Sequence, residues 1–437
     1  MKIELKNCAP FLHVSDNSTE CDASCIFVLT DLNAAYAQQA KENGCTKIIS
    51  PKECLNLLGI SDAINIIGIT GTNGKTTTAA AIYSILLDLG KKVGLQGTRG
   101  CFINDQRIEE KSLTTPPILQ TIHNLKLAVE AECEYFVMEV SSHAIVQNRI
   151  DGLPFALKIL TNVTQDHLDF HKTIDEYVAV KSRFFDDESL KLLNKDESKI
   201  RFNRTNAMSY GIEHPATYKI LAYSLKEGIS AAVAKIEKVY EFESPLHGFF
   251  NLYNILAAIS AVDMLGVASM EAICEVVEHF GGVEGRMEVV SQDPLVIVDF
   301  AHTPDGMEKV LDSMKEHDLV VVFGAGGDRD RTKRPKMGAM AQRYAKKIVV
   351  TSDNPRSEDP NSIISEILSG MNPSESLHVE VDRHKAIEKA LALQGENEVL
   401  LILGKGDETY QEIHGKKYPF DDRSVVRELI TQWAKQK

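Results

Sequence analysis

The segment from residue 64 to residue 89 constrains the fold of this chain more than any other. An apolar run, Ile64 to Ile69, predicts a short buried strand. A polar turn with Gly71 and Gly74 follows, and apolar residues then recur with helical spacing from Ile82 to Leu89. This order predicts a phosphate-binding loop, in which backbone N–H groups and the helix N-terminus face an anion.

The residues around the second glycine indicate which anion is bound. Gly74-Lys75-Thr76 is typical of nucleoside triphosphate sites, where the lysine reaches the outer phosphates and the threonine hydroxyl binds Mg²⁺. The usual pattern has another glycine five residues before Gly74, where this chain has Ile69. The loop at residues 71–77 is therefore a compact form, Gly-Thr-Asn-Gly-Lys-Thr-Thr. The alternative, an ordinary glycine-rich turn, would not require Gly-Lys-Thr at this point.

Length and composition set limits on the class of protein. The 437 residues are too many for one core and predict two or three domains. A net charge of −14 argues against general nucleic-acid binding. The eight cysteines show no paired zinc spacing, so we interpret them as reduced thiols of a cytoplasmic protein. The sequence shows no signal-peptide pattern and no apolar run of membrane-spanning length, so we expect no membrane insertion.

Strand and helix patterns alternate from residue 61 onward, which predicts an α/β fold with a parallel sheet. In such sheets, ligands bind beyond the carboxyl ends of the strands. Glu139 ends one predicted strand and His167 follows another, so both are expected at the same edge as Lys75 and Thr76. Each alone could be a solvated acid or a loop histidine. Together with a phosphate loop, they are better interpreted as metal ligands.

Lys181 is anomalous in the helix that follows Thr173. It falls on the apolar face of that helix, four residues after Tyr177 and three before Phe184. A lysine in this position must extend its ammonium to solvent, pair with an acid, or change its chemistry. Extension to solvent is the default for a single lysine, and the residues alone leave the three alternatives open.

The pattern predicts three domains. Residues 1–60 form a small N-terminal α/β unit, and residues 61–284 form a central P-loop domain with a small antiparallel flap. A glycine-rich hinge near Gly285 leads into residues 285–437, where strand–helix alternation restarts as a Rossmann-like domain. Asn251 and Asn254 lie on one face of an alanine-rich helix, where they either cap the helix or contact a ligand.

Distinctive polar residues also follow the strands of the C-terminal domain. They are Asp299 and His302, the loop 324–331, the segment Asp353-Asn354-Pro355-Arg356, and the loop 404–408. The glycine loop at 324–327 lacks the spacing of a dinucleotide site, which argues against NAD. Its alternating acids and arginines favour a zwitterionic or anionic ligand, with a solvated charged loop as the alternative.

Several of these motifs together resemble the Mur ligases of peptidoglycan synthesis. The matching pieces, in the family's order, are the loop 71–77, Glu139-Val140-Ser141-Ser142-His143, Asn162-Val163-Thr164-Gln165-Asp166-His167-Leu168-Asp169, Lys181, the Asn251/Asn254 helix, Gly285-Arg286-Met287-Glu288 and Asp299-Phe300-Ala301-His302-Thr303-Pro304. Within the family, Asp353-Asn354-Pro355-Arg356 is similar to the signature of members that add meso-diaminopimelate to UDP-N-acetylmuramoyl-L-alanyl-D-glutamate.

The resemblance implies an ATP-dependent amide ligase that forms an acyl phosphate, in the cytoplasmic synthesis of the cell-wall precursor on which cell shape and division depend. Its three domains would bind the UDP precursor, ATP and the amino acid. The implied ATP residues are Gly71, Thr72, Asn73, Gly74, Lys75, Thr76, Thr77, Asn251, Arg286, Asp299 and His302. The implied precursor residues are Ser18, Thr114, Thr115, Ser141, Gln147 and Arg149. The implied diaminopimelate residues are Arg329, Asp353, Asn354, Pro355, Arg356, Gly404 and Glu408.

The resemblance also implies a two-metal site. Thr76, Glu139 and His167 would be ligands of two Mg²⁺ ions, and Lys181 would carry a carbamate derived from CO₂. The implied catalytic residues are Lys75, Glu139, His167 and Lys181. A carbamate would resolve the anomaly of Lys181, because a bare ammonium beside Mg²⁺ is repelled whereas a carbamate is negatively charged.

Two segments depart from the family's pattern. The N-terminal unit is short, and an Asp-Ser-Arg turn of the family reads Asp16-Asn17-Ser18 here. A Gly-Lys-Gly-His-Glu segment of many relatives has Asp407 in place of the histidine and keeps Glu408.

Other functions remain open at this stage. The same reaction with L-lysine, or a folylpolyglutamate synthase-like ligase, would use the same phosphate loop. The segment 353–356 counts against both, and the Thr114-Thr115-Pro116 turn counts against the folylpolyglutamate synthase. A nucleotide-dependent switch is disfavoured because no base-reading Asn-Lys-x-Asp segment is evident. A non-catalytic binding module would not need the whole set of metal ligands. We expect small-molecule substrates only, no nucleic-acid partner, and a monomer.

Overall fold

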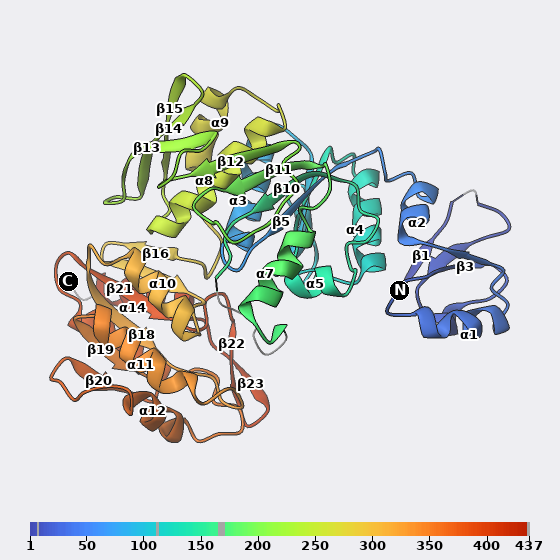
Figure 1. Cartoon of the computed structure of the whole chain (residues 1–437). Coiled ribbons are helices and arrows are strands. Elements are labelled where there is room, and N and C mark those ends of the chain that lie inside the picture. Colours follow the sequence, from blue (N-terminus) through green and yellow to red (C-terminus); the bar gives the residue numbers. More distant parts are fainter. Residues whose placement is uncertain (7, 111–112, 165–170, 435–437) are drawn as a thin grey trace. The chain divides into compact units, whose positions relative to one another are not determined.

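A computed structural model describes residues 1–6, 8–110, 113–164 and 171–434 (Figure 1). The chain divides into two compact units. The first contains Met1–Ser224, Ser230–Ser244 and Leu252–Phe280, and the second contains Leu225–Ile229, Pro245–Asn251 and Gly281–Lys437. Both units are α/β, which confirms the predicted fold class. The predicted boundaries after residues 60 and 284 are not tested by this division and stay predictions.

A four-stranded sheet begins the first unit. Its order is β1 (Lys2–Glu4), β2 (His13–Ser15), β3 (Cys25–Val28) and β4 (Lys47–Ile49), with β1 antiparallel and the others parallel. The helical segments around it are η1 (Ser18–Glu20), η2 (Ala34–Tyr36), α1 (Ala37–Glu42) and α2 (Pro51–Leu57). A capping box formed by Ser50 and Glu53 begins α2.

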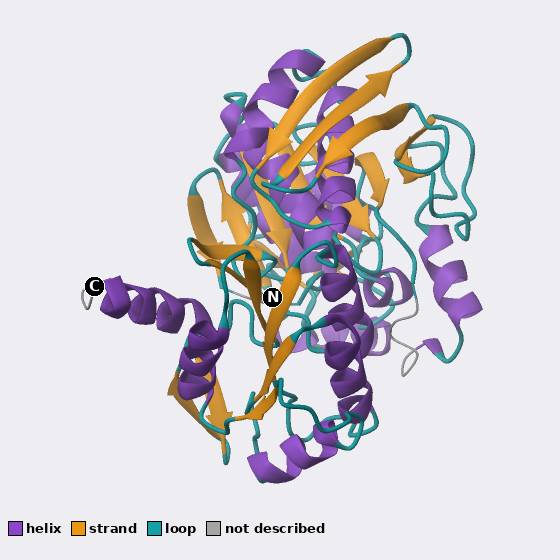
Figure 2. Cartoon of the chain, turned by 90° about the vertical axis from the view of Figure 1, so that its left-hand side faces the viewer, coloured by secondary structure: helices purple, strands orange, loops and turns teal. Residues whose placement is uncertain are grey.

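An eleven-stranded sheet forms the centre of the first unit. The phosphate-loop strand β5 (Asn65–Thr70) lies between β9 (Tyr135–Glu139) and β10 (Phe155–Leu160), and both neighbours are parallel to it. Every residue of β5 except the first is buried, as in a parallel strand covered on both faces. Helix α3 (Lys75–Asp88) follows β5 and packs against β9. The carboxyl ends of these strands therefore meet at one edge. Figure 2 shows helices in purple beside strands in orange.

The remaining strands of this sheet refine one expectation. A small antiparallel flap was expected on the central domain, and antiparallel pairing is present between β13 and β14. The strands β11, β12 and β13 pair in parallel and extend the central sheet beyond β10, which was not expected. Parallel strands typically show continuous apolar runs, and β11 and β12 are too short and too mixed in polarity to show one. The strands are β6 (Val93–Gly97), β7 (Gly100–Ile103), β8 (Gln106–Glu109), β11 (Leu190–Asn194), β12 (Ala207–Gly211), β13 (Tyr218–Ser224), β14 (Ile229–Lys235) and β15 (Lys238–Ser244).

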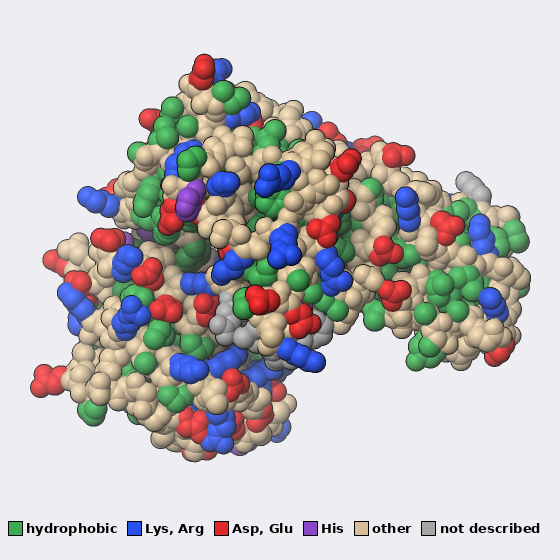
Figure 3. Space-filling model, in the orientation of Figure 1, with side chains coloured by type: hydrophobic (Ala, Val, Ile, Leu, Met, Phe, Trp, Pro, Cys, Tyr) green, Lys and Arg blue, Asp and Glu red, His purple; other side chains and the backbone are tan. Residues whose placement is uncertain are grey.

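The helices of this part of the chain are α4 (Ile118–Glu130), α5 (Ser142–Val146), α7 (Ile174–Arg183), α8 (Phe249–Met264), α9 (Met270–Val276) and η3 (Val277–His279). None of the helices in the described ranges has the length and apolar character that a membrane span needs. Acidic, basic and apolar side chains are mixed on the face of the molecule drawn in Figure 3.

The second unit contains a six-stranded sheet in the order β16-β17-β21-β18-β19-β20. Its strands are β16 (Glu288–Gln292), β17 (Leu295–Asp299), β18 (Asp318–Phe323), β19 (Lys347–Val350), β20 (Leu377–Val379) and β21 (Glu398–Leu403). Only β16 pairs in the antiparallel direction. Alternate residues of β18 enter different hydrophobic clusters, Val321 on one face and Val320 and Val322 on the other.

Helices and one hairpin complete the second unit. The helices are α10 (Pro304–Ser313), α11 (Lys333–Tyr344), α12 (Pro360–Leu368), α13 (Arg383–Leu393) and α14 (Asp422–Ala434). The hairpin joins β22 (Tyr410–Ile413) to β23 (Lys416–Pro419) and was not expected from the sequence.

A fully buried ion pair links α13 and α14. The guanidinium of Arg383 donates to both carboxylate oxygens of Asp422 at 2.7 Å, and neither side chain is exposed. Arg383 also donates to the carbonyl oxygen of Leu403, at the end of β21, at 3.0 Å. The pair therefore fixes the starts of both helices against the strand end that precedes the loop 404–408.

Substitution of Asp422 by Asn should destabilise the second unit by about 3–5 kcal/mol, because it leaves a buried arginine without its counter-charge. Urea unfolding followed by the fluorescence of Trp433 measures this, since the only tryptophan of the chain lies on α14 and packs against the core of this unit. As a control, Asp318→Asn removes an exposed ion pair with Lys346 and should cost less than about 1 kcal/mol. Equal unfolding midpoints for the two variants would contradict the assignment.

Candidate active site

Two glycines shape the phosphate loop between β5 and α3. Gly71 and Gly74 have φ of 155° and 82°, in the region that favours glycine. A Cβ on Gly71 would lie 1.8 Å from Thr161 Oγ1, and one on Gly74 would lie 2.2 Å from Asn254 Oδ1. Only glycine therefore fits at either position. Asn254 contacts the loop itself, and it also accepts a 3.4 Å hydrogen bond from the hydroxyl of Thr78.

The segment after β10 clamps this loop. Thr161 Oγ1 donates to the carbonyl oxygen of Asn73 at 2.6 Å, and Asn162 Oδ1 accepts from the Asn73 N–H at 3.0 Å. The Thr164 N–H donates to Thr72 Oγ1 at 3.0 Å. The Asn-Val-Thr motif recognised in the sequence thus has a direct structural role. His167, three residues further on, lies outside the described residues and stays a prediction.

Glu139 is buried at the carboxyl end of β9, next to the phosphate loop. Its Oε2 accepts from the hydroxyl of Thr76 at 3.0 Å, as the sheet topology predicted. Thr98 holds the same carboxylate at both oxygens: its N–H donates to Oε1 at 2.9 Å, and its hydroxyl donates to Oε2 at 3.3 Å. The site therefore offers a buried carboxylate and a hydroxyl in contact, which are oxygen ligands suited to Mg²⁺.

Four of the predicted precursor residues of the first unit form a connected group. Thr115 Oγ1 donates to the carbonyl oxygen of Glu139 at 2.9 Å and accepts from the Ser141 N–H at 3.0 Å. Arg149 Nη1 donates to the carbonyl oxygen of Thr115 at 2.8 Å. Arg149 Nε is buried without a hydrogen-bond partner, and burial lowers the pKa of this arginine. Thr114 Oγ1 lies 3.1 Å from the hydroxyl of Thr98.

Gln147 and Ser18 occupy more distant positions. Gln147 caps the C-terminus of α5, the helix that Ser141 begins. Ser18 lies in the N-terminal sheet region, where its hydroxyl donates to Gln39 Oε1 at 2.8 Å and is buried. The structure therefore brings together Thr114, Thr115, Ser141 and Arg149, whereas it leaves Ser18 in an internal contact.

Lys181 is buried rather than extended to solvent. Its side chain comes from α7, and the residue is 1% exposed. The ammonium donates to the carbonyl oxygen of Gly71 at 2.9 Å and to Thr70 Oγ1 at 3.3 Å, and it lies 4.8 Å from the ring centroid of Tyr177. The apolar helix face therefore delivers this lysine to the base of the phosphate loop, which excludes the solvent-exposed alternative.

Three of the predicted nucleotide residues of the second unit, Arg286, Asp299 and His302, lie near the end of β17. Asp299 accepts from the N–H groups of Met287 and Ala301 at 2.8 and 2.7 Å, and burial raises the pKa of its carboxyl group. The guanidinium of Arg286 lies 4.6 Å from the ring centroid of Phe300. His302 is exposed two residues further on, and Asn251 donates to the carbonyl oxygen of His247 at 2.8 Å.

The segment after β19 holds an unusual carboxylate. Asp353 Oδ1 accepts from the Asn354 N–H at 2.7 Å, whereas Oδ2 is buried and has no hydrogen-bond partner. Arg383 Nη1 lies 3.9 Å from Oδ2, beyond hydrogen-bond range. A Cβ on Gly404 would lie 2.6 Å from the same oxygen, so a side chain at this position would collide with it. A buried acceptor of this kind is suited to a cationic ligand.

Arginines lie on the other side of this segment. Arg356 donates from Nη1 to the carbonyl oxygen of Gly327 at 2.7 Å, and Arg356 Nη1 and Arg329 Cγ lie 2.9 and 3.7 Å from the position of a Cβ on Gly326. The glycine loop thus serves close packing, because a Cβ on Gly327 would lie 1.9 Å from the carbonyl oxygen of Pro355. Asn354 and Glu408 are joined by a 2.8 Å hydrogen bond.

Sequence reasoning missed the hairpin that holds this segment. Glu412, on β22, accepts from the Arg356 N–H at 3.0 Å through its carbonyl oxygen, and its carboxylate lies 3.3 Å from Arg356 Nε. The turn of the hairpin, His414-Gly415, has positive φ at both residues. A two-residue turn with glycine between two four-residue stretches was the signal that could have revealed it.

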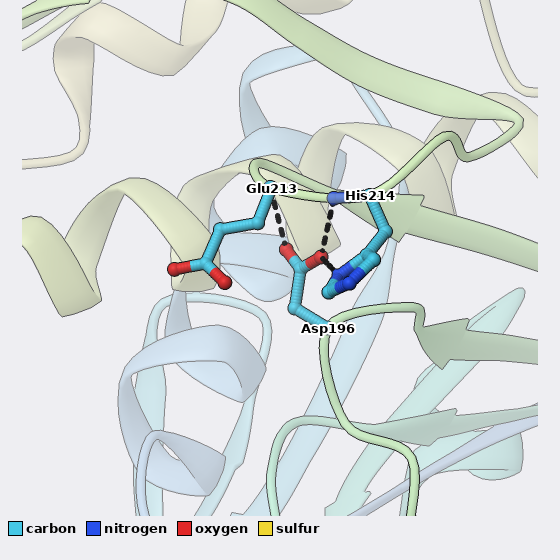
Figure 4. Close-up of side chains that lie close together, drawn as sticks. All are labelled: Asp196, Glu213 and His214. Atoms are coloured by element: carbon cyan, nitrogen blue, oxygen red, sulfur yellow. Dashed lines mark hydrogen bonds and ion pairs between the residues drawn. The ribbon is translucent and has the colours of Figure 1, made fainter.

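Two other features do not coincide with the predicted site. A groove of about 1040 Å³ in the second unit is lined by Ser352, Pro355 and Gln411, among others, but not by the side chains of Asp353 or Arg356. Asp196, Glu213 and His214 lie close enough to hold a metal ion (Figure 4). The carboxylate of Asp196, however, already accepts from three backbone N–H groups at 2.7 to 3.0 Å, so it anchors a turn.

Comparison with known families decides the classification. The sequence matches the "Mur ligase middle domain" over residues 69–262 and the "Mur ligase, glutamate ligase domain" over residues 285–406. The chain belongs to the Mur ligase family. The proteins named UDP-N-acetylmuramoyl-L-alanyl-D-glutamate--2,6-diaminopimelate ligase from Wolinella succinogenes and Helicobacter pylori are 56% and 50% identical to this Mur ligase. The alignments cover 94% and 95% of this chain, and 95% of each relative.

Solved structures agree with this classification. A structure of a UDP-N-acetylmuramoyl-L-alanyl-D-glutamate--2,6-diaminopimelate ligase matches this Mur ligase with a TM-score of 0.75 and 29% identity, over 99% of this chain and 100% of the other. A Mycobacterium tuberculosis folylpolyglutamate synthase matches with a TM-score of 0.63 at 17% identity, over 81% of this chain and 92% of the other, and it shares the fold alone.

Substitution of Gly97 by Ala should impair this Mur ligase through Glu139. A Cβ on Gly97 would lie 2.2 Å from Glu139 Oε1, although the backbone of Gly97 itself is compatible with alanine. Displacing a metal ligand usually costs tenfold or more in metal affinity, so if Glu139 binds Mg²⁺ as predicted, we expect about a tenfold rise in the Mg²⁺ concentration for half-maximal turnover. Mn²⁺ binding followed by electron paramagnetic resonance gives a second readout.

Gly395→Ala is the matched control, because a Cβ there comes no closer than 3.5 Å to any neighbour. It should leave both readouts unchanged. An unchanged Mg²⁺ requirement in Gly97→Ala would show that Glu139 does not support the metal.

Proposed function

We propose that this Mur ligase uses ATP to join 2,6-diaminopimelate, as the meso isomer, to the D-glutamate of UDP-N-acetylmuramoyl-L-alanyl-D-glutamate. The observation that carries the assignment of the amino acid is a buried carboxylate oxygen on Asp353 that accepts no hydrogen bond from the described part of the chain, with an arginine, Arg356, three residues later in the same segment. The names of relatives at 50–56% identity over nearly the whole chain support it.

The two groups complement the far end of diaminopimelate. That end carries an ammonium and a carboxylate, whereas L-lysine carries only the ammonium. Asp353 Oδ2 would accept from the ammonium, and Arg356, with Arg329 near it, would form a charge-assisted pair with the carboxylate. Asn354, Gly404 and Glu408 complete the proposed site. A carboxylate-binding arginine therefore favours diaminopimelate over L-lysine.

The phosphate loop would hold ATP. Its backbone, Lys75 and Thr77 would bind the phosphates, and Asn251, Arg286, Asp299 and His302 are the proposed contacts to the rest of the nucleotide. Thr76 and Glu139 fit Mg²⁺ by their chemistry and proximity, and His167 is the further proposed ligand. When bound, Mg²⁺ would neutralise charge on the transferring phosphoryl group.

The reaction would proceed in two steps on the precursor. The D-glutamyl carboxylate attacks the γ-phosphorus of ATP to give an acyl phosphate and ADP. The amine of diaminopimelate then attacks the acyl carbon, and phosphate leaves. The protein mainly positions and stabilises charge: Lys75 faces the phosphoryl group, while Thr114, Thr115, Ser141, Gln147 and Arg149 orient the peptide, with Ser18 near the uridine. We place this reaction in the cytoplasm and on a monomer.

Lys181 is proposed to act as a carbamate. Its amine, once unprotonated, would add to CO₂ with loss of a proton, which turns a cation into an anion. The buried position against Gly71, next to the proposed phosphate and metal sites, supports this role, because an anion there would orient the metal-bound phosphate.

Phosphate release from ATP tests the activity directly, with and without the UDP-muramoyl-dipeptide and with each diamino acid in turn. Against this baseline, Arg356→Lys or Arg356→Ala should raise the KM for diaminopimelate by about tenfold or more, because a bidentate charge-assisted pair is lost. The KM for ATP should stay within about twofold of the wild-type value, because Arg356 would contact diaminopimelate and not ATP.

The control is Arg343→Ala, which removes an exposed arginine paired with Glu308 and should alter neither constant. Equal increases in the KM for ATP and for diaminopimelate in the Arg356 variants would remove the assignment of Arg356 to the amino-acid site.

Lys181→Ala should lose most activity, and a short carboxylate such as acetate or formate, or added bicarbonate, should partly restore it. The reason is that the proposed carbamate contributes a negative charge, which a small anion in the vacated space can supply. Lys75→Ala is the matched comparison: its loss should resist rescue by carboxylates, because this lysine acts as a cation. Rescue of Lys181→Ala by methylammonium instead, or full activity without any addition, would contradict the proposal that Lys181 carries a carbamate.

A further inference from the structure

Lys405 is a buried lysine that no part of the proposed reaction uses. It lies in the loop after β21 and is 0% exposed. Its ammonium donates to Glu408 Oε2 at 3.0 Å and to Asn354 Oδ1 at 3.2 Å. A buried ammonium is costly unless it is paired and hydrogen-bonded. Here both partners belong to the proposed diaminopimelate site.

The three side chains form a closed triangle. Asn354 Nδ2 donates to Glu408 Oε2 at 2.8 Å, and Asn354 Oδ1 also accepts from the Glu412 N–H at 2.9 Å. The amide of Asn354 therefore has a fixed orientation, since its donor and its acceptor are both engaged. Glu408 is held in turn by two donors at the same oxygen.

This arrangement leaves one oxygen of Glu408 available. Oε2 receives both Lys405 and Asn354, whereas Oε1 accepts no hydrogen bond from the part of the chain that the structure describes. Glu408 is also partly exposed, with 19% of its side chain accessible. The same pattern occurs at Asp353, which is anchored at Oδ1 by the Asn354 N–H and unpartnered at Oδ2. Both acids thus have one oxygen that accepts no hydrogen bond from the described residues and are fixed at the other.

Two buried cations lie beside this pair of acids. Asp353 and Glu408 both contact Asn354, and two carboxylates in one partly buried site repel each other. Lys405, directly bonded to Glu408, and Arg383, 3.9 Å from Asp353 Oδ2, offset part of that repulsion.

We propose that Lys405 is a positioning residue for diaminopimelate: it holds Glu408 and Asn354 so that the free oxygen of Glu408 faces the ammonium group of the bound amino acid. Lys405 itself does not touch the substrate and acts through Glu408. The inference rests on the proposed function, and it adds to it a residue that sets affinity for the amino acid.

Lys405→Met tests the proposal, because methionine retains much of the length of the side chain and removes the charge. The KM for diaminopimelate should rise by about tenfold to a hundredfold, the usual effect of losing hydrogen bonds to a charged group. The KM values for ATP and for the UDP precursor should stay within about twofold of wild type. An unchanged KM for diaminopimelate, or equal increases for all three substrates, would falsify the proposal.

A double-mutant cycle separates positioning from general stability. If Lys405 acts through Glu408, the variant carrying both Lys405→Met and Glu408→Gln should bind diaminopimelate within about twofold of Glu408→Gln alone. Fully additive effects of the two substitutions would mean that Lys405 acts independently of Glu408, which overturns the proposed route.

Lys191→Met is the matched control. Lys191 is equally buried, but its ammonium donates to the carbonyl oxygens of Ser189 and Thr205, at 2.7 and 2.9 Å, in the other unit. It should lose stability without a change in the KM for diaminopimelate. If Lys405→Met does not fold, Lys405→Gln, which is polar and uncharged, is measured by the same criteria.

The wild-type enzyme is assayed first. No diaminopimelate-dependent phosphate release from ATP and UDP-muramoyl-dipeptide would refute the proposed function itself. Diaminopimelate-dependent release with a normal KM in the Lys405 variants would refute only the role of Lys405.

Discussion

The carbonyl oxygen of Gly71 accepts hydrogen bonds from two lysines, Lys75 at 2.8 Å and Lys181 at 2.9 Å. The rest of the first unit's site depends on this contact, because it fixes the phosphate loop from its own helix and from α7. Two ammonium groups on one acceptor repel each other, so the loop is more stable when an anion joins them. A nucleoside triphosphate provides that anion. The proposed carbamate acts in the same direction, since it replaces one of two like charges by an opposite charge.

The second unit uses buried cations in a different way. Arg383 and Lys405 are buried next to Asp353 and Asn354, and each is bonded to an acid, Asp422 and Glu408 respectively. They hold the backbone and side chains of this segment and leave single carboxylate oxygens without a hydrogen bond within the described ranges. Rigid support of this kind preserves the orientation of binding groups, on which affinity and rate depend strongly. The side chains of this site lie on loops, but their orientation is held by these buried contacts.

Much of this arrangement could be predicted from local sequence patterns, and the remainder depends on distant contacts. Strand–helix alternation predicted that Thr76 and Glu139 lie at one sheet edge, and helical periodicity identified Lys181 as a lysine on an apolar face. Lys405, by contrast, reads as an ordinary loop lysine, because its burial depends on Asn354, fifty-one residues earlier. Thr98 was missed for the same reason, since its partner Glu139 is forty-one residues away. The parallel direction of β11 and β12 was not predicted either, because these short strands of mixed polarity lack the continuous apolar run typical of parallel strands.

The contacts of Arg356 change the physical account of substrate choice. An arginine without any partner would reject L-lysine strongly, because the bound complex would leave a polar group unpaired. Arg356 is not in that state: its Nη1 donates to the carbonyl oxygen of Gly327, and its Nε lies 3.3 Å from the carboxylate of Glu412. The cost of binding L-lysine is therefore smaller than for an unpaired arginine. In the proposed site, preference for diaminopimelate would then come mainly from what its carboxylate gains at the remaining donors of Arg356, together with Arg329. Specificity of this kind is a positive contribution of the correct substrate more than a penalty on the wrong one.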